Sequence, residues 1–201
     1  MSEYQRWEDR FSATDYVFGR EPNYFLASCR TLLPKGGKAL AVADGEGRNG
    51  VWLAERGLDV TSIDFSPTAQ AKAVALAKER GVDVTFKLAD VHGWEYPEAA
   101  FDVVAEIFTQ FSTPAERTHK WNGMRRALKP EGLLIVHGYT PKQLQYGTGG
   151  PKEVENLYTR DMLLAAFGDL RDVQIIEEER EIHEGAGHGG MSAVIGLTAR
   201  K

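Results

Sequence analysis

A glycine-rich loop between two apolar segments constrains the fold of this chain more than any other feature. The loop runs from Ala43 to Gly50 and reads ADGEGRNG. Residues 40–43 are apolar and predict a short buried strand, and an apolar helical face begins at Val51 and ends at Gly57. A strand, a glycine loop and a helix in this order are typical of the phosphate- or nucleoside-binding unit of an α/β protein.

The charges in this loop discriminate between classes of ligand. Gly45, Gly47 and Gly50 satisfy the G-x-G-x-x-G spacing of dinucleotide-binding proteins, so the spacing alone leaves NAD(P) and FAD open. The loop also carries two acids, Asp44 and Glu46, which would repel a pyrophosphate. S-adenosylmethionine has no phosphate and carries a positive ammonium and a positive sulfonium. The acids therefore favour S-adenosylmethionine over a dinucleotide.

Strand-like and helix-like segments alternate from residue 38 onward, which is typical of a parallel sheet flanked by helices. Beyond the glycine loop we predict strands over 60–63, 82–88, 101–107 and 133–136, and helices over 69–80, 114–128 and 159–167, with a turn at 129–132 and a long polar loop over 139–155. Ser66 is expected to cap the first of these helices and Gly81 to end it.

Two further strands, 173–182 and 192–199, are separated by a glycine-rich run over 184–190 and predict an antiparallel hairpin. The whole pattern predicts an α/β fold: a Rossmann-like, doubly wound, seven-stranded mixed sheet with an antiparallel C-terminal hairpin. We expect one domain over residues 1–201, with an N-terminal lid or cap segment over 1–35 and a core over 36–201. The first 25 residues hold many of the aromatic side chains, which favours a segment packed across the sheet end, a lid over a bound ligand, or both.

Composition excludes several function classes. The net charge of −5, without clustered Lys and Arg, argues against nucleic acid as a partner, and no apolar run is long enough to span a membrane. A single cysteine, Cys29, is incompatible with an internal disulfide and fits the cytoplasm. No group of histidines shows metal-ligand spacing, so no metal is expected. A small-molecule acceptor is the expected partner, and the oligomeric state is left open.

Two acids follow two successive strands and add to the glycine loop. Asp64 lies 19 residues after Gly45, at the end of the second strand, where a carboxylate can accept hydrogen bonds from both ribose hydroxyls of an adenosine. Asp90 follows the third strand and could accept a hydrogen bond from the adenine amino group. The alternative is that both acids only stabilise turns, for which aspartate is common.

Five segments carry a resemblance to a known family. They are 7–11, 16–26 with the sequence GREPN at its centre, 45–49, 60–66, and 146–152. With them, the chain resembles the class I S-adenosylmethionine-dependent methyltransferases, in particular a small bacterial group related to the tellurite-resistance methyltransferases and, more distantly, the thiopurine methyltransferases. The resemblance covers nearly the whole chain and implies the Rossmann-like fold and the cofactor S-adenosylmethionine, but it says little about the acceptor.

The glycine loop departs from the family pattern at two positions. Ala43 stands where the first glycine is usual, and Ala41 where an acid is usual. The cofactor ammonium is therefore left to Asp44, to Glu46 or to the backbone carbonyl of Ala43. By the resemblance, the backbone at Phe65 and Val91 and the side chain of Ile107 line the cofactor. The full expected cofactor set is Ala43, Asp44, Gly45, Glu46, Gly47, Asn49, Asp64, Phe65, Ser66, Asp90, Val91 and Ile107.

The acceptor side of the site is less defined by the sequence. Phe108, Phe111 and Tyr146 could form an apolar wall for the acceptor, or be ordinary core and rim residues. A soft or anionic acceptor, such as a thiol or a chalcogen oxyanion, needs no general base, whereas a neutral hydroxyl or amine does. Tyr139 and His188 are the two candidates for a base, and we expect both in loops, with an exposed position the more common fate of such a histidine.

Three functions remain open on the sequence alone. An S-adenosylmethionine-dependent methyltransferase acting on a small molecule accounts for the acids, the glycines and the resemblance. An NAD(P)-dependent oxidoreductase accounts for the glycine spacing. A non-catalytic cofactor-binding protein would account for the absence of an assignable base.

Overall fold

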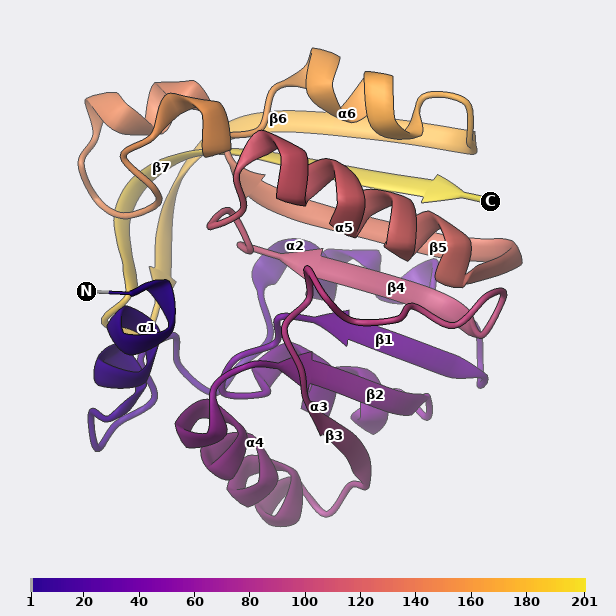
Figure 1. The fold of residues 1–201 in the computed structure, drawn as a ribbon, viewed down its shortest axis with the longest axis horizontal. Helices are drawn as coiled ribbons and strands as arrows, with labels where there is room; N and C mark the ends of the chain where they lie inside the picture. Colours follow the sequence, from indigo (N-terminus) through magenta and orange to yellow (C-terminus); the bar gives the residue numbers. More distant parts are fainter. Residues whose placement is uncertain (1) are drawn as a thin grey trace.

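A seven-stranded sheet with the strand order β3-β2-β1-β4-β5-β7-β6 forms the centre of the molecule in the computed structural model, which describes residues 2–201 (Figure 1). The strands are β1 (Lys38–Val42), β2 (Asp59–Asp64), β3 (Val84–Leu88), β4 (Phe101–Ile107), β5 (Leu128–Tyr139), β6 (Arg171–Glu184) and β7 (His188–Arg200). Strands β1 to β5 are parallel, and β7 runs antiparallel to both β5 and β6. The predicted mixed sheet and its C-terminal hairpin are confirmed.

Helices cover both faces of this sheet. The α-helices are α1 (Glu3–Phe11), α2 (Tyr24–Ser28), α3 (Arg48–Glu55), α4 (Pro67–Arg80), α5 (Pro114–Ala127) and α6 (Arg160–Phe167), and short 3₁₀ helices are η1 (Cys29–Thr31), η2 (Pro141–Gln145) and η3 (Val154–Asn156). Alternate residues of each central strand point to opposite faces: Leu134 and Val136 of β5 pack with α5 and α6, whereas Leu133 and Ile135 pack with α2 and α3. Because both faces are buried, the central strands β1 and β4 are mainly apolar, although β4 contains the buried Glu106.

Local sequence determines where helix α4, which lies next to the site, begins and ends. The Ser66 hydroxyl accepts a hydrogen bond from the Ala69 amide, Pro67 occupies the first turn, and Gly81 ends the helix in the left-handed region at φ 68°. These are the residues expected from the sequence. The cap fixes the start of α4 at Pro67, close behind Asp64, the last residue of β2.

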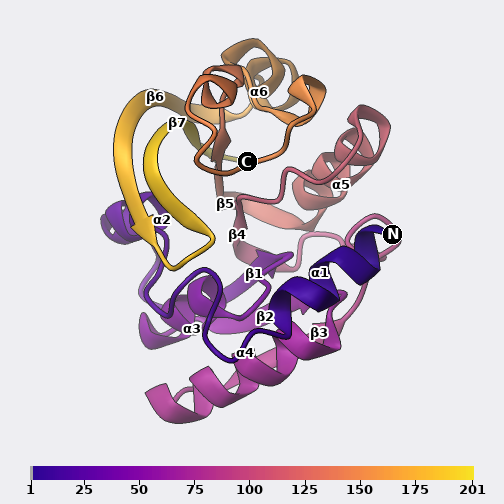
Figure 2. The same cartoon turned by 90° about the vertical axis from the view of Figure 1, so that its left-hand side faces the viewer.

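The C-terminal hairpin is longer than predicted. Residues 184–190 were expected to connect the two strands, but β6 and β7 pair as far as Glu184 opposite His188, and only residues 185–187 turn. The glycines favoured a loop in the prediction, but glycine is compatible with strand pairing when a partner strand lies alongside. Figure 2 shows both strands bending out of the sheet, and the Gly187 amide donates to the Val17 carbonyl at 2.7 Å. The hairpin tip thus meets the N-terminal segment.

Other boundaries also differ from prediction. Residues 129–132 belong to β5, where the register shifts between Phe101 and Val103 of β4 and Glu131 has φ 67°, so the expected turn is an irregularity within a strand. Strand β3 begins at Val84 rather than at 82. Short-range turn signals cannot show that a neighbouring strand will hold such a segment extended.

The N-terminal segment is ordered around helix α1, which lies beside the carboxyl ends of the strands (Figure 2). The Glu8 carboxylate accepts from the hydroxyls of Ser66 and Thr68, at the start of α4, and Phe11 packs in a small cluster with Val17. For residues 2–25, packing across the sheet end, one of the two interpretations of the aromatic-rich segment, describes this arrangement; the lid interpretation and the division at residue 35 stay predictions.

Candidate functional site

A cavity of about 390 Å³ lies at the carboxyl ends of β1, β2, β4 and β5. The residues around it come from α1, the glycine loop, the ends of these strands, the segment 150–153 and the hairpin tip. Carboxyl ends of parallel strands are the usual place for a ligand in an open α/β sheet, because the connecting loops diverge there. Within the described part of the chain, no group of three or more His, Cys, Asp or Glu side chains could hold a metal. No helix among residues 2–201 is long and apolar enough to cross a membrane.

The glycine loop brings the backbone close to α4. Gly47 has φ 85°, and a Cβ there would lie 2.5 Å from the Cβ of Ala73 in α4. Glycine is needed at this position both for its conformation and for the close approach of the helix. Gly45, at φ 57°, lies against the Phe11 ring of α1, which closes one side of the cavity.

Asp64 is buried at the end of β2 and lines the cavity. Its carboxylate accepts hydrogen bonds from the amides of Gly45 at 2.8 Å and Ser66 at 2.9 Å. Burial raises the pKa of Asp64 to about 6, against the opposing effect of these two bonds. The carboxylate is thereby held at the loop, with lone pairs left for a ligand hydroxyl.

Asp44 is the second buried carboxylate on the cavity wall. It accepts from the Gly50 amide at 3.0 Å and from the Ser62 hydroxyl at 3.0 Å. Burial raises the pKa of Asp44 to about 7, and the nearby charge of Asp64 adds to this. No ion pair to Asp44 or Asp64 exists within residues 2–201, so a cationic ligand in the cavity would relieve the cost of charging both.

Glu46, the other acid of the loop, has a different environment. Its carboxylate forms an ion pair with Lys72 at 2.8 Å and accepts from the Phe18 amide at 3.3 Å. It does not line the cavity. The loop therefore places Asp44 in the lining of the cavity and uses Glu46 to hold α4 and the N-terminal segment, a difference that the sequence alone does not reveal.

The expected cofactor residues divide into two groups. Ala43, Asp44, Gly45, Asn49, Asp64 and Ile107 line the cavity, whereas Glu46, Gly47, Phe65, Ser66, Asp90 and Val91 do not. Asp90 is exposed and accepts from the His92 amide at 2.9 Å, as the turn interpretation of this residue requires, and Val91 lies in the core. A role of Asp90 toward adenine stays a prediction.

Two of the three expected acceptor residues meet at the cavity. Phe108 and Phe111 line it, together with Trp7 from α1. The ring centroids of Trp7 and Phe111 lie 6.3 Å apart, although the first residue belongs to the N-terminal helix and the second lies near the middle of the chain. Tyr146 lies outside the cavity, and its hydroxyl donates to Glu179 of β6.

Tyr139 and His188 are brought together by the long hairpin. The Tyr139 hydroxyl lies 2.9 Å from Nδ1 of His188, and both side chains are buried and line the cavity. Both had been expected in loops; instead Tyr139 ends β5 and His188 begins β7. The exposed position expected for His188 is wrong, because the hairpin tip folds over the cavity.

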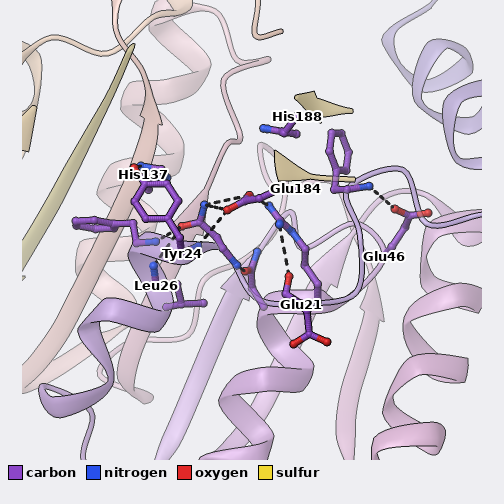
Figure 3. Close-up of polar contacts among 12 residues, drawn as sticks. Glu21, Tyr24, Leu26, Glu46, His137, Glu184 and His188 are labelled. Atoms are coloured by element: carbon purple, nitrogen blue, oxygen red, sulfur yellow. Dashed lines mark hydrogen bonds and ion pairs between the residues drawn. The ribbon is translucent and has the colours of Figure 1, made fainter. Parts of the chain in front are cut away.

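A buried ionic cluster that the sequence did not predict holds the hairpin to the glycine loop (Figure 3). Arg48, the first residue of α3, pairs with Glu184 of β6 at 2.6 Å. Glu184 also accepts from the Asn23 side chain and the Tyr24 amide, each at 3.0 Å. Asn23 in turn caps α2 through the Phe25 amide. The segment GREPN before α2 was the only sequence signal for this cluster, and it did not identify the partner.

Comparisons with known proteins were consistent with this geometry. A family model described as a methyltransferase domain matches residues 39–132. Among curated proteins, the chain is 29% identical over 129 residues to the 2-heptyl-1-hydroxyquinolin-4(1H)-one methyltransferase of Mycobacteroides abscessus; the match covers 63% of this chain and 57% of that protein. The chain thus spans little more than half the length of this relative.

Solved structures of low sequence identity share the fold. TehB from Haemophilus influenzae superposes with a TM-score of 0.73 at 16% identity, over 100% of this chain and 67% of TehB. The N-methyltransferase NodS from Bradyrhizobium japonicum, in complex with S-adenosylhomocysteine, gives a TM-score of 0.69 at 15% identity, over 98% and 97% of the two chains. The chain thus carries a segment, residues 39–132, that matches a methyltransferase domain, on a fold that it shares with solved methyltransferase structures.

Proposed function

We propose that the protein transfers the methyl group of S-adenosylmethionine to a small molecule with a soft or anionic nucleophile, such as a thiol or a chalcogen oxyanion. One observation carries the cofactor half of this proposal. Asp44 and Asp64 are buried on the cavity wall without a cationic side chain bonded to either among residues 2–201. A positively charged ligand offsets the cost of burying them, whereas the pyrophosphate of NAD(P) would increase that cost.

The residues on the wall fit S-adenosylmethionine at distinct points. Asp64 would accept hydrogen bonds from the ribose hydroxyls, and Asp44 would face the ammonium, since Glu46 is already paired with Lys72. Asn49 and Ile107 complete this half of the cavity. When bound, the cofactor supplies an electrophilic methyl group on a positive sulfonium.

The other half of the cavity supports a small acceptor. Its wall is formed by aromatic rings, of which Trp7, Phe108 and Phe111 are examples. Helix α1 and the hairpin tip border this cavity. Shielding two bound reactants from water and holding them in line are the main contributions a protein makes to a direct displacement. The relative from M. abscessus is named for a small heteroaromatic acceptor, which further supports this choice over a macromolecule.

Isothermal calorimetry on protein freed of bound ligand tests the cofactor. We expect micromolar affinity for S-adenosylmethionine and S-adenosylhomocysteine and none for NADH or NADPH; tight binding of either nicotinamide would overturn the charge argument. Incubation with methyl-labelled cofactor and a panel of thiols, phenols and chalcogen oxyanions then tests transfer. Cofactor binding with no methylated product from any acceptor would favour a non-catalytic binding protein.

A further inference from the structure

The charged side chains at the hairpin end of the cavity restrict the chemical class of the acceptor further. Arg10 of α1 lines the cavity, and its guanidinium packs over the rings of Phe18 at 4.9 Å and Trp7 at 5.3 Å. A Cβ at Gly187 would lie 3.0 Å from Nη2 of Arg10, so this cation lies directly beside the residue that precedes His188. Stacking on two aromatic faces holds the guanidinium in place without neutralising it.

Arg10 has no carboxylate partner within residues 2–201, in contrast to the other arginines of the cavity. Arg6 is paired with Glu3 at 2.5 Å, and Arg48 with Glu184 at 2.6 Å. Partial burial lowers the pKa of Arg10, and the neighbouring charge of Arg6 lowers it further. Both effects mean that keeping the Arg10 guanidinium charged costs free energy. An anionic ligand at this end of the cavity would offset that cost.

His188 lies beside Arg10 in an aromatic enclosure. Its ring is 4.3 Å from the Phe108 ring and 4.6 Å from the Phe18 ring, centroid to centroid, and it stacks on Tyr139. A buried tyrosine hydroxyl needs an acceptor, and Nδ1 of His188 at 2.9 Å provides one. With Tyr139 donating to Nδ1, the imidazole proton resides on Nε2, and this N–H is left to donate into the cavity.

The surroundings of His188 oppose a role as a proton acceptor. Burial lowers its pKa well below the ordinary value, and the charges of Arg48 and Arg10 lower it further. Burial also raises the pKa of Tyr139 above its ordinary value, so this side chain stays protonated. The titratable groups around His188 come from each neighbouring element: Arg10 of α1, Arg48 of α3, His137 and Tyr139 of β5, and Glu184 of β6, whose charge Arg48 balances.

We propose that the acceptor is a flat aromatic anion, a phenolate or an aromatic thiolate, that binds with Arg10 as its charge partner and the Nε2–H of His188 as its hydrogen-bond donor. This inference rests on the proposed methyl transfer, and it specifies the chemical class of the acceptor and the residues that bind it. The oxyanion or thiolate lone pair forms the new bond to the methyl carbon, and the electron pair of the breaking carbon–sulfur bond stays on the sulfonium sulfur. No proton moves in this step, so no base is used, and Tyr139 is a positioning residue that fixes the imidazole tautomer.

The binding test uses 4-nitrophenol and S-adenosylhomocysteine-loaded protein, since the visible absorbance of the probe reports whether it is ionised. We expect the apparent pKa of bound 4-nitrophenol to fall below its value in buffer, and Arg10→Gln to weaken binding of the phenolate roughly 10- to 100-fold and to abolish the shift. Arg160→Gln, which removes an exposed arginine outside the cavity, serves as the matched control. Binding of the neutral phenol, or no binding of the probe, would overturn the acceptor class.

A methyl-transfer assay distinguishes between a hydrogen-bond donor and a general base at His188. Glutamine places an N–H near the position of imidazole Nε2 but cannot take a proton, so His188→Gln should retain activity within a few-fold, whereas His188→Leu should lose roughly tenfold or more. A general base would instead make both variants lose on the order of 10²- to 10⁴-fold. The pH at which kcat/KM levels off should move with the pKa of the acceptor when 4-nitrophenol is replaced by 4-nitrothiophenol; a constant break point would contradict the proposal.

Failure of this inference is distinguishable from failure of the proposed function. S-adenosylhomocysteine binding is measured by calorimetry before the probe is added. Absence of that binding counts against the methyltransferase activity itself. Cofactor binding and product formation, combined with an inactive His188→Gln or an unaltered Arg10→Gln, would leave the activity standing and reject the anion site.

Discussion

Arg48 and Glu184 lie 136 positions apart in the sequence and form an ion pair of 2.6 Å with side chains only 7% and 9% exposed. Arg48 begins the helix after the glycine loop, and Glu184 ends β6 at the hairpin tip. The pair therefore joins the cofactor half of the cavity to the structure that carries His188. Since a buried charge without its partner is costly, this contact should contribute more to the folded state than an exposed pair.

Replacing Glu184 with glutamine should destabilise the protein by about 3 kcal/mol, because Arg48 would be left buried without a charge partner. Urea unfolding measures the change. Glu177→Gln, on the same strand, breaks the exposed pair with Arg160 and should cost at most about 1 kcal/mol. Equal losses in the two variants would mean that the buried pair has no special role.

Asp64→Ala should abolish measurable cofactor binding while leaving the fold intact, because the carboxylate is the group expected to accept from both ribose hydroxyls. Charge-assisted hydrogen bonds of this kind are each worth roughly 1.5–3 kcal/mol, or one to two orders of magnitude in affinity. Calorimetry with S-adenosylhomocysteine provides the measurement. Asp59→Ala, at the exposed opposite end of the same strand, is the control. Affinity retained within a few-fold in Asp64→Ala would reject the ribose assignment.

The stability of the ligand-free protein should fall as pH rises from about 4 to about 7. The pKa of Asp44 is raised by burial from 3.8 to about 7, so the folded state binds more protons than the unfolded state within this window. At about 1.4 kcal/mol per pKa unit, the loss is on the order of 4 kcal/mol, and Asp64, with its pKa raised to about 6, acts in the same direction.

Urea unfolding at several pH values checks this dependence. Asp44→Asn keeps an acceptor for the Gly50 amide but cannot ionise, so its stability should vary less with pH than that of the unmodified protein. The exposed Asp59→Asn should leave the dependence unchanged. A rise in stability over the same interval would show that burial does not dominate at Asp44.

Gly47→Ala should cost more than Gly81→Ala, although both residues have positive φ. A Cβ at Gly81 meets nothing within 4 Å, so only the strain of the left-handed conformation, about 1 kcal/mol, is added. At Gly47 the Cβ would lie 2.5 Å from that of Ala73, and the helix must shift, which adds roughly 1–3 kcal/mol. Thermal or urea unfolding compares the two. Similar losses would mean that α4 moves away freely.

The sequence by itself determined the elements whose causes are local. The Ser66 cap, Pro67 and Gly81 set the limits of α4, and the apolar run over 101–107 gave a central strand with its boundaries. The alternation of such segments predicted a doubly wound sheet. The spacing from Gly45 to Asp64 placed both at one edge, where the Gly45 amide does donate to the Asp64 carboxylate. Hydrogen bonds and side-chain periodicity over a few residues are sufficient for these features.

Only the tertiary structure decided the use of each polar group at the cavity. Asp44 and Glu46 look equivalent in the sequence, yet Glu46 forms an ion pair with Lys72, while Asp44 lines the cavity. Tyr139 and His188 became a hydrogen-bonded pair because β7 extends to the hairpin tip and the tip is held by a backbone bond to Val17. These contacts join residues far apart in the sequence, and their energies depend on burial, which no local pattern of residues specifies.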